Sequence, residues 1–315
     1  MNLIEYTYNL VRQIPPGRVS SYGAVAEALG DSRAARSVGY MMNQNPDADT
    51  MPCFKIVHSD GRLGGFGLGE HDKIHRLQDD GVQVKDGGIV DFEKVFFNEF
   101  TTEYPLKKLR QKQVETCKEI SLENSVDDII SVAGVDVAYP HEAFDQACGA
   151  IVVMDFASGD LLESHVDFAS SLFPYIPTYL FYREFPVLKT LFQKLSSCPS
   201  VVLFDGHGIL HPFGCGLASQ AGVALDIASI GVAKSALGGK VRKDQVFINN
   251  EARGTVGYFS KQAKHPVYIS PGHKISLEKS REIVQQVSTH KIPEPLRQAH
   301  LLATKSLRKQ RHGST

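Results

Sequence analysis

The chain has 315 residues, of which 42 % are hydrophobic and 22 % charged, a composition typical of a water-soluble globular protein with one large or two ordinary domains. Its formal net charge is −1, so the overall charge gives no indication of a nucleic-acid partner. No apolar run approaches the roughly 18 residues of a membrane-spanning helix and the first residues do not follow the signal-peptide pattern, so we expect a cytoplasmic protein that does not bind membranes.

The five cysteines lie far apart along the chain, and no CxxC pair occurs. This spacing argues against a disulfide framework and against a zinc cluster. By default each cysteine is a small buried hydrophobic residue.

The first 90 residues are rich in glycine and in short helical patterns. Helices are predicted over 7–13 and 21–29, with the Pro15-Pro16-Gly17 break between them and Ser20 or Ser21 as a cap. A third helix over 34–43 follows a tight Gly-Asp turn, so the pair fits a helix-turn-helix. We expect an N-terminal domain over 1–91 with a winged helix-turn-helix-like fold and a linker over 92–105.

The remaining residues, 106–315, are expected to form a second domain. It opens with an amphipathic helix over 106–120 and continues with strands at 129–137, 147–154 and 161–168. Later elements are predicted as helices at 178–195, 217–229, 276–288 and 293–308, and as strands at 200–204, 245–249, 254–259 and 266–270. Three leading strands followed by helix-strand alternation indicate an α/β or α+β fold with a mixed sheet flanked by helices.

Two carboxylates follow predicted strands of this second domain. Asp136 and Asp205 each stand where a strand ends, and ligands of open α/β sheets bind beyond such ends. Glu184, on the intervening helix, could add a third carboxylate. Oxygen ligands in this number suit Mg²⁺ or Mn²⁺, whereas a single Asp after a strand more often only begins a turn.

The local sequences around these carboxylates resemble the motifs of endonuclease V, a nuclease that cuts DNA beside deaminated adenine. The matching stretches run in order from about residue 106 to 307: VAGVDVAY at 132–139, PYIP at 174–177 with Arg183-Glu184, DGHG at 205–208, GVAKS at 231–235, SPGH at 270–273 and PEPLRQAH at 293–300. The resemblance implies a ribonuclease-H-like fold and Mg²⁺-dependent hydrolysis of the second phosphodiester 3′ of hypoxanthine.

The resemblance also implies roles for individual residues. Asp136, Asp205 and Glu184 become the carboxylates of the metal site. His300 is expected near the metal, where it orients a water, and Lys234 near a phosphate.

Tyr175 occupies the position of a wedge, an aromatic ring that fills the gap left by an extruded base. The alternative for this residue is a half-buried aromatic in a proline-rich turn. His207, within DGHG, is interpreted as a packing or supporting residue rather than a ligand, because the nearby carboxylates already suit a hard ion.

Residues 15–81 carry a second resemblance, to the DNA-binding and active-site domain of O6-alkylguanine-DNA alkyltransferases. The matching stretches are GRVSSY at 17–22, AARSVG at 34–39, Asn45-Pro46, Pro52-Cys53, KIV at 55–57, the glycine-rich loop at 61–69 and LQDDG at 77–81.

This resemblance implies that Cys53 is the nucleophile that accepts the alkyl group, a reaction that suits a thiolate and that each molecule performs once. Arg36 would replace the flipped guanine in the base stack, Tyr22 would help to turn the base out, and Asn45 would shape the turn around the active site.

One departure from the alkyltransferase pattern concerns the activation of Cys53. Phe54 stands where the family has a histidine that helps to draw the proton from the thiol, and Asp80 stands where a glutamate is usual. Activation then comes through another group or water, or else the domain binds alkylated DNA without repairing it.

The main hypothesis is therefore a fused DNA-repair protein that acts on double-stranded DNA with alkylated guanine or deaminated bases, without an obligate protein partner. Three alternatives remain: a nuclease whose first domain only binds alkylated DNA, a non-catalytic lesion-recognition protein, and an inosine-directed ribonuclease.

Overall fold

A computed structural model describes residues 1–126, 128–140, 146–170, 172–259 and 265–313 of the protein, with side chains given up to residue 310. Within these ranges, no helix has the length and apolarity that crossing a membrane requires. The chain divides into two compact units: Met1–Gln111 with Leu172–Pro177, and Lys112–Ser171 with Thr178–Thr315. Helix α6 (Pro105–Cys117) contains the first boundary.

The first unit consists of short helices and two-stranded sheets. Its elements are α1 (Leu3–Val11), β1 (Ser20–Ser21), α2 (Tyr22–Leu29), the 3₁₀ turn η1 (Ser32–Ala34), α3 (Ala35–Asn43), the 3₁₀ turn η2 (Cys53–Lys55), β2 (Ile56–Val57), α4 (Glu70–Asp79), β3 (Val84–Lys85), β4 (Gly88–Ile89) and α5 (Phe92–Val95). Strand β1 pairs with β2 in parallel, and β3 pairs with β4 as an antiparallel hairpin.

The expected helix-turn-helix is formed by α2 and α3. Ser21 caps α2, because its side chain accepts a hydrogen bond from the backbone N–H of Ala24 (3.0 Å). Gly30 ends the helix in a left-handed conformation (φ 104°), which glycine adopts without strain. Both features follow from residues that the sequence analysis had singled out.

The end of α5 and the segment after it hydrogen-bond to the start of the chain within the first unit. Val19 donates its N–H to the Val95 carbonyl and accepts from Phe97, at 2.9 and 2.7 Å. Thr101 and Gln13 exchange two further hydrogen bonds between backbone and side chain.

The second unit is built on a nine-stranded mixed sheet in the order β10-β11-β12-β13-β9-β8-β5-β6-β7. Strands β5, β8 and β9 are parallel, whereas β6, β7 and β13 run antiparallel to their neighbours. The strands are β5 (Ser131–Ala138), β6 (Gln146–Asp155), β7 (Leu161–Ser170), β8 (Val201–Asp205), β9 (Ser229–Ala233), β10 (Lys240–Arg242), β11 (Gln245–Ile248), β12 (Glu251–Gly257) and β13 (Val267–His273). The helices are α7 (Leu180–Phe192), α8 (Leu217–Leu225), α9 (Leu277–Gln286) and α10 (Glu294–Gly313).

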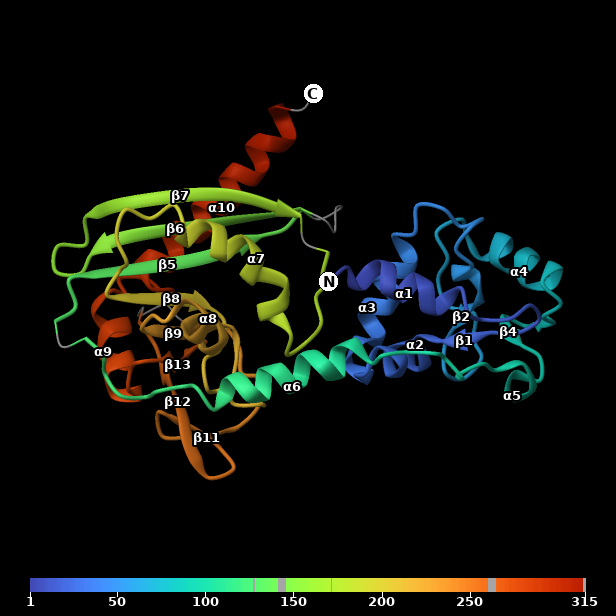
Figure 1. Ribbon diagram of the computed structural model, residues 1–315, viewed down its shortest axis with the longest axis horizontal. Coiled ribbons are helices and arrows are strands. Elements are labelled where there is room, and N and C mark those ends of the chain that lie inside the picture. Colours follow the sequence, from blue (N-terminus) through green and yellow to red (C-terminus); the bar gives the residue numbers. More distant parts are fainter. Residues whose placement is uncertain (127, 141–145, 171, 260–264, 314–315) are drawn as a thin grey trace. The chain divides into compact units, whose positions relative to one another are not determined.

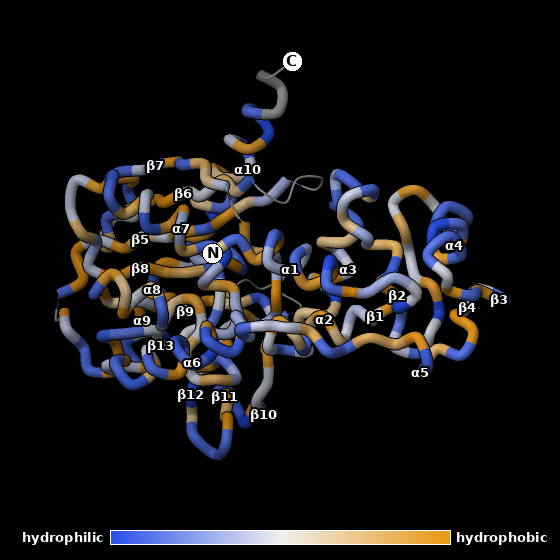
Figure 2. Tube along the Cα trace, turned by 45° about the vertical axis from the view of Figure 1, so that its right-hand side comes forward, coloured by the Kyte–Doolittle hydropathy of each residue, from blue (hydrophilic) through white to orange (hydrophobic). Residues whose placement is uncertain are grey.

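Each face of this sheet is covered by helices, so the unit has three layers (Figure 1). One core joins the sheet to α7 and α8, with Val135, Phe204 and Leu188 among its members. The other joins it to α9 and α10 through residues such as Leu203 and Leu296. Figure 2 shows that the central strands of this sheet carry many hydrophobic residues, whereas helix α4 of the first unit is hydrophilic. The mixed sheet flanked by helices is confirmed.

Several elements differ from the predicted ones, and two of the differences lie close to the candidate carboxylates. The helix expected over 217–229 ends at Leu225, because Asp226 adopts a left-handed conformation (φ 56°) and caps it. Ser229–Ala233 then forms β9, a strand that the sequence analysis missed. Asp136 lies inside β5 rather than after it, because pairing with β6 continues to Ala138. The pairing of β5 with β8, however, ends just before Asp136, at the pair formed by Val135 and Phe204.

Candidate functional site

Asp136 and Asp205 lie side by side on neighbouring parallel strands. The last residue pair that β5 and β8 share is Val135 with Phe204, so the two aspartates occupy the next position on each strand. Neighbouring strands are about 4.8 Å apart. Because successive side chains alternate between faces and Val135 and Phe204 face α7 and α8, both carboxylates face α10.

Helix α10 places His300 against Asp136. Leu296 and Ala299 are buried in the core on this side of the sheet, which fixes the helix and leaves His300 at its exposed edge. The His300 Nδ1 atom lies 2.8 Å from Asp136 Oδ2, within hydrogen-bonding distance. The close approach of α10 to the strand depends on Gly134, whose hydrogen faces the backbone of Pro295 and Leu296.

Lys234 follows β9 directly and brings a positive charge to Asp205. Its ammonium group donates a hydrogen bond to Asp205 Oδ2 at 2.5 Å. Burial opposes the charge on Lys234, but attraction to Asp205 and Asp136 outweighs it and raises the pKa of the lysine. Burial also raises the pKa of Asp205, although Lys234 works in the opposite direction.

Glu184 is the third carboxylate of the group, and it comes from α7 on the other side of the sheet. Its pKa is raised well above the ordinary value, first by burial and then by repulsion from Asp136 and Asp205, while Arg183 lowers it. The guanidinium of Arg183 stacks on the ring of Tyr139, 3.9 Å from its centroid, which ties the start of α7 to the chain just after β5.

The donor set has the chemistry of a site for a divalent cation. Three carboxylates repel one another here, and the ammonium of Lys234 already occupies an oxygen of Asp205. Among the described residues, no three acidic, histidine or cysteine side chains are arranged around one point as the ligands of a metal ion. Lys234 and His300 each contact an aspartate oxygen that could otherwise bind an ion. The residues therefore fit a hard cation in type and charge, and its binding would require Lys234 to leave Asp205.

Two further residues of the predicted nuclease site are placed as follows. Tyr175 lies in the segment Leu172–Pro177, which groups with the first unit, and 56 % of its surface is exposed. His207 is buried, and its Nε2 atom lies 3.0 Å from the carbonyl oxygen of Ser235, which is the residue after Lys234.

In the first unit, Cys53 lies at the start of η2 and is 5 % exposed. Asn45 donates a hydrogen bond from Nδ2 to the Cys53 sulfur (3.2 Å) and others to the carbonyls of Asp47 and Met51. Asn45 therefore shapes the turn as well as contacting the thiol. Burial raises the pKa of Cys53, while the Asn45 hydrogen bond and the charges of Lys73 and Arg76 lower it.

The two residues that depart from the alkyltransferase pattern, Phe54 and Asp80, both have partners other than Cys53. Phe54 packs against the hydrophobic cluster that includes Leu77 and Val82. Asp80 forms an ion pair with Lys55 (2.8 Å) and accepts a hydrogen bond from the Gly17 N–H (2.9 Å).

Lys73 is a charged neighbour of Cys53 that the sequence analysis missed. It is fully buried in α4, and its ammonium donates hydrogen bonds to the carbonyls of Ile56 (2.7 Å) and Leu63 (2.5 Å). Burial lowers the pKa of Lys73 to about 8, while the nearby Cys53 raises it. No sequence signal marks this lysine, because a lysine on a polar helix is usually exposed.

Tyr22 and Arg36 lie on the two helices of the helix-turn-helix. Tyr22 opens α2, and its hydroxyl lies 3.1 Å from where a side chain at Gly64 would begin, so the glycine-rich loop passes close to it. Burial raises the pKa of Tyr22, and the negative form of Cys53 adds to this. Arg36 is exposed on α3.

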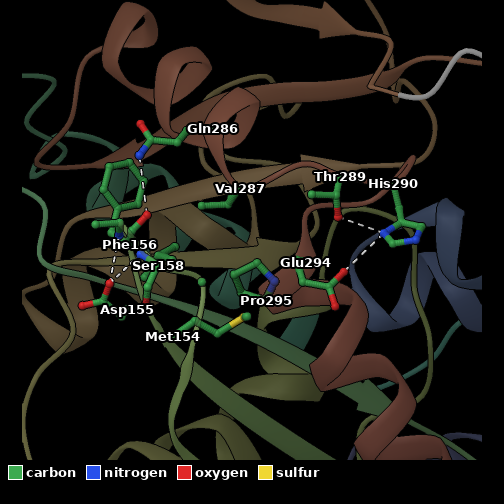
Figure 3. Close-up of a pocket in the computed structure, with 13 residues that line it drawn as sticks. Met154, Asp155, Phe156, Ser158, Gln286, Val287, Thr289, His290, Glu294 and Pro295 are labelled. Carbon is green, nitrogen blue, oxygen red and sulfur yellow. Dashed lines mark hydrogen bonds and ion pairs between the residues drawn. The ribbon is translucent and has the colours of Figure 1, made fainter.

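Figure 3 shows a cavity of about 400 Å³ in the second unit, and Asp136, Glu184 and Asp205 are not among the residues that line it. It is formed by the β6–β7 turn and by the connection from α9 to α10, and it reaches β5 at Val132, near the strand's start. Figure 3 shows Glu294 directed toward His290, at 3.4 Å, and Met154 and Pro295 on the apolar side. The catalytic candidates Asp136, Glu184 and Asp205 are thus not part of this cavity.

Comparison with known proteins identifies both parts. Residues 112–301 match the family Endonuclease V, and residues 3–82 match the family 6-O-methylguanine DNA methyltransferase, DNA binding domain. A bifunctional methyltransferase/endonuclease of Picrophilus torridus is 38 % identical over 300 residues, covering 95 % of each chain. One from Thermoplasma volcanium is 39 % identical over 303 residues, covering 96 % of this chain and 89 % of the relative.

Solved structures agree for the second unit. The catalytic domain of human endonuclease V superposes with a TM-score of 0.62 at 26 % identity, covering 67 % of this chain and 98 % of that one. Endonuclease V of Ciona intestinalis, in complex with DNA containing an inosine followed by a ribo-adenosine, gives 0.61 at 27 % identity, covering 65 % and 98 %. The chain belongs to the bifunctional methyltransferase/endonuclease family, in which an endonuclease V domain follows a methyltransferase DNA-binding domain.

Proposed function

We propose that the second unit nicks nucleic acid on the 3′ side of hypoxanthine, using Asp136, Glu184 and Asp205 to hold a divalent metal ion. The observation that carries this proposal is the group of three mutually repelling carboxylates on adjacent strands and on α7. Endonuclease V is a divalent-metal-dependent nuclease family. For the ion itself we propose Mg²⁺, with Mn²⁺ as a substitute, because the donors are all hard oxygens.

Each residue around the carboxylates has a distinct proposed task. A bound divalent ion would supply positive charge against the charge that builds up on the attacked phosphate. Lys234, held on Asp205 in this structure, would turn its ammonium to a phosphate oxygen. His300, hydrogen-bonded to Asp136, would orient the attacking water, and exposed Tyr175 would fill the space left by the extruded base.

The test is a nicking assay with Mg²⁺ on a duplex that contains a single inosine. We expect Asp136→Asn and Asp205→Asn to lose at least about 100-fold in rate, since a carboxylate that binds the ion is replaced by a neutral amide. Asp160→Asn, at an exposed turn position, is the matched control and should nick like the wild type. Equal nicking by all four proteins would remove the metal-site assignment.

The same assay distinguishes between DNA and RNA as the substrate. The Ciona intestinalis enzyme was crystallised with an inosine followed by a ribo-adenosine, which makes inosine-directed ribonuclease activity the second candidate. Substrates with deoxyribose or ribose after the inosine should be compared side by side. We propose DNA as the substrate, and a strong preference for the ribose-containing strand would favour the ribonuclease.

For the first unit, we propose transfer of an alkyl group from O6-alkylguanine in DNA to the sulfur of Cys53. Support comes from the buried thiol, its hydrogen bond from Asn45, and the exposed Arg36 on α3. In the transfer, the Cys53 thiol loses its proton and the sulfur attacks the alkyl carbon; the C–O bond breaks, and guanine leaves with the electron pair and takes up a proton. The resulting thioether is not a leaving group, so each molecule reacts once.

Transfer is tested by incubating the protein with DNA that carries isotope-labelled O6-methylguanine. The label should appear on the wild type and not on Cys53→Ala, while Cys198→Ala, at an exposed cysteine, should be labelled like the wild type. Tight binding of the DNA without any labelled protein would favour the alternative, a non-catalytic module that binds alkylated DNA.

We retain 1–91 and 106–315 as the proposed domains, with 92–105 as the connection.

A further inference from the structure

Two of the free cysteines lie next to each other in the second unit. Cys117 is the last residue of α6, and Cys215 lies in the loop that leads from Asp205 to α8. The Cys117 sulfur is 3.7 Å from the Phe213 carbonyl and 3.1 Å from the point where a side chain at Gly214 would begin. Each thiol affects the ionisation of the other, so the two side chains interact.

The backbone around this pair is already fixed. Gln113, one helical turn before Cys117, donates a hydrogen bond from Nε2 to the Cys215 carbonyl (2.6 Å). Gly214 has a positive φ of 69° and carries no side chain, so the sulfur of Cys117 has room beside the loop. These contacts hold the Cys117 sulfur against the residues that directly precede Cys215.

The two thiols differ in access and in acidity. Cys117 is partly exposed, whereas Cys215 is fully buried. The hydrogen bond from Cys215 lowers the pKa of Cys117, and the positive charge of Arg253 adds to this against the effect of burial. The pKa of Cys215 is raised, because it keeps the shared proton and is buried. Cys117 is thus the reactive member of the pair.

We propose that Cys117 and Cys215 form a redox-active dithiol, which small-molecule disulfides oxidise to an internal disulfide that joins α6 to the loop between Asp205 and α8.

The reaction takes place by two exchange steps. The Cys117 thiolate attacks one sulfur of glutathione disulfide, which forms a mixed disulfide and releases a glutathione thiolate. The Cys215 thiol then loses its proton and attacks the Cys117 sulfur, which releases the second glutathione. Two protein thiols are oxidised, and one glutathione disulfide is reduced to two glutathione molecules.

The other cysteines of the second unit lack this arrangement. Cys148 is fully buried, and burial raises its pKa to about 11. Cys198 is exposed, and its sulfur is 3.7 Å from the carbonyl of the next residue, Pro199. Cys198 therefore serves as an internal reference for an exposed thiol that can take up glutathione but has no resolving partner.

The experiment treats the full-length protein with glutathione disulfide and maps each cysteine by mass spectrometry of non-reduced peptides. In the wild type, we expect a cross-link between the peptides of Cys117 and Cys215, a loss of two hydrogens and no retained glutathione at either site. Dithiothreitol should restore both thiols. Cys215→Ser should accumulate glutathione on Cys117, whereas Cys117→Ser should leave Cys215 unmodified.

Several results would overturn the proposal. One is a wild-type Cys117 that retains glutathione while Cys215 stays free, because the sulfurs would then be too far apart to resolve. Another is an unreacted Cys117 in protein whose Cys198 is modified. Because the wild-type peptides alone distinguish these outcomes, the test holds even if a serine variant folds poorly.

Discussion

Replacing Gly134 by alanine should damage the nuclease site through α10, without touching any proposed ligand. A Cβ atom at this position would lie closer than 3.0 Å to the backbone of Pro295 and Leu296, a separation that real Cβ atoms essentially never show. Backbone cannot rotate aside as a side chain can. The first turn of α10 must therefore move away from β5.

The size of the effect follows from this geometry. Overpacking of this kind costs about 1–3 kcal/mol of stability, and each kcal/mol lowers the melting temperature by about 2–4 °C in a unit of this size. His300 is carried on the displaced helix and is held 2.8 Å from Asp136. A displacement of about 1 Å breaks this contact and should lower the nicking rate by about 100-fold.

The assay compares nicking rates and melting curves of wild type, Gly134→Ala and Gly238→Ala. A Cβ atom at Gly238 would meet nothing within 4 Å, so its variant controls for the substitution itself. The proposed methyl transfer to Cys53 gives a second control, because Cys53 belongs to the other unit and the transfer should not change. Nicking by Gly134→Ala within twofold of wild type, at an unchanged melting temperature, would refute the reasoning.

Three further predictions concern titratable groups. Glu184→Gln should abolish nicking yet raise the melting temperature of the metal-free protein at neutral pH. The pKa of Glu184 is raised in the folded state, so its charged form makes the wild type less stable than the variant at neutral pH. This difference in stability should shrink as the pH falls through the raised pKa and vanish below 4.5. Calorimetry in the presence of a chelator should therefore show the melting temperatures of wild type and Glu184→Gln converging in acid. Asn45→Ala should move the pH–rate profile of methyl transfer to higher pH, since burial raises the pKa of Cys53 and the hydrogen bond from Asn45 lowers it. An unchanged profile would mean that Asn45 only shapes the turn and does not assist ionisation of the thiol. Burial lowers the pKa of Lys73 to about 8, so the first unit should gain stability between about pH 8 and pH 10.5, where the unfolded chain still binds the proton; hydrogen exchange should detect this gain in wild type and lose it in Lys73→Met.

Local signals explain which parts of the fold the sequence could predict. Ser21 caps α2, Gly30 ends it, and Asp205 closes β8, because each depends on residues close in the chain. The helix predicted over 217–229 was wrong at its end, since only the left-handed conformation of Asp226 separates α8 from β9. The conformation of Asp226 depends on the pairing of β9 within the sheet and not on the local sequence.

The site shows the same division. Asp136 and Asp205 could be proposed from strand ends, although Asp136 proved to lie inside β5, because the antiparallel partner β6 extends the strand. Lys73 beside Cys53 could not be proposed at all. Its burial depends on carbonyl groups of β2 and the glycine-rich loop, and no pattern in α4 announces them.

The contact between His300 and Asp136 has a consequence for synthesis. These residues are 164 positions apart, so a growing chain must add that many residues after Asp136 before the nuclease site can close. Asn45 and Cys53 are only eight positions apart, and the thiol's setting can assemble as soon as the first unit emerges. At about 5–20 residues per second, adding the 164 residues takes about 8–33 seconds, so the proposed alkyl acceptor exists for at least that long before the same molecule can cut a strand.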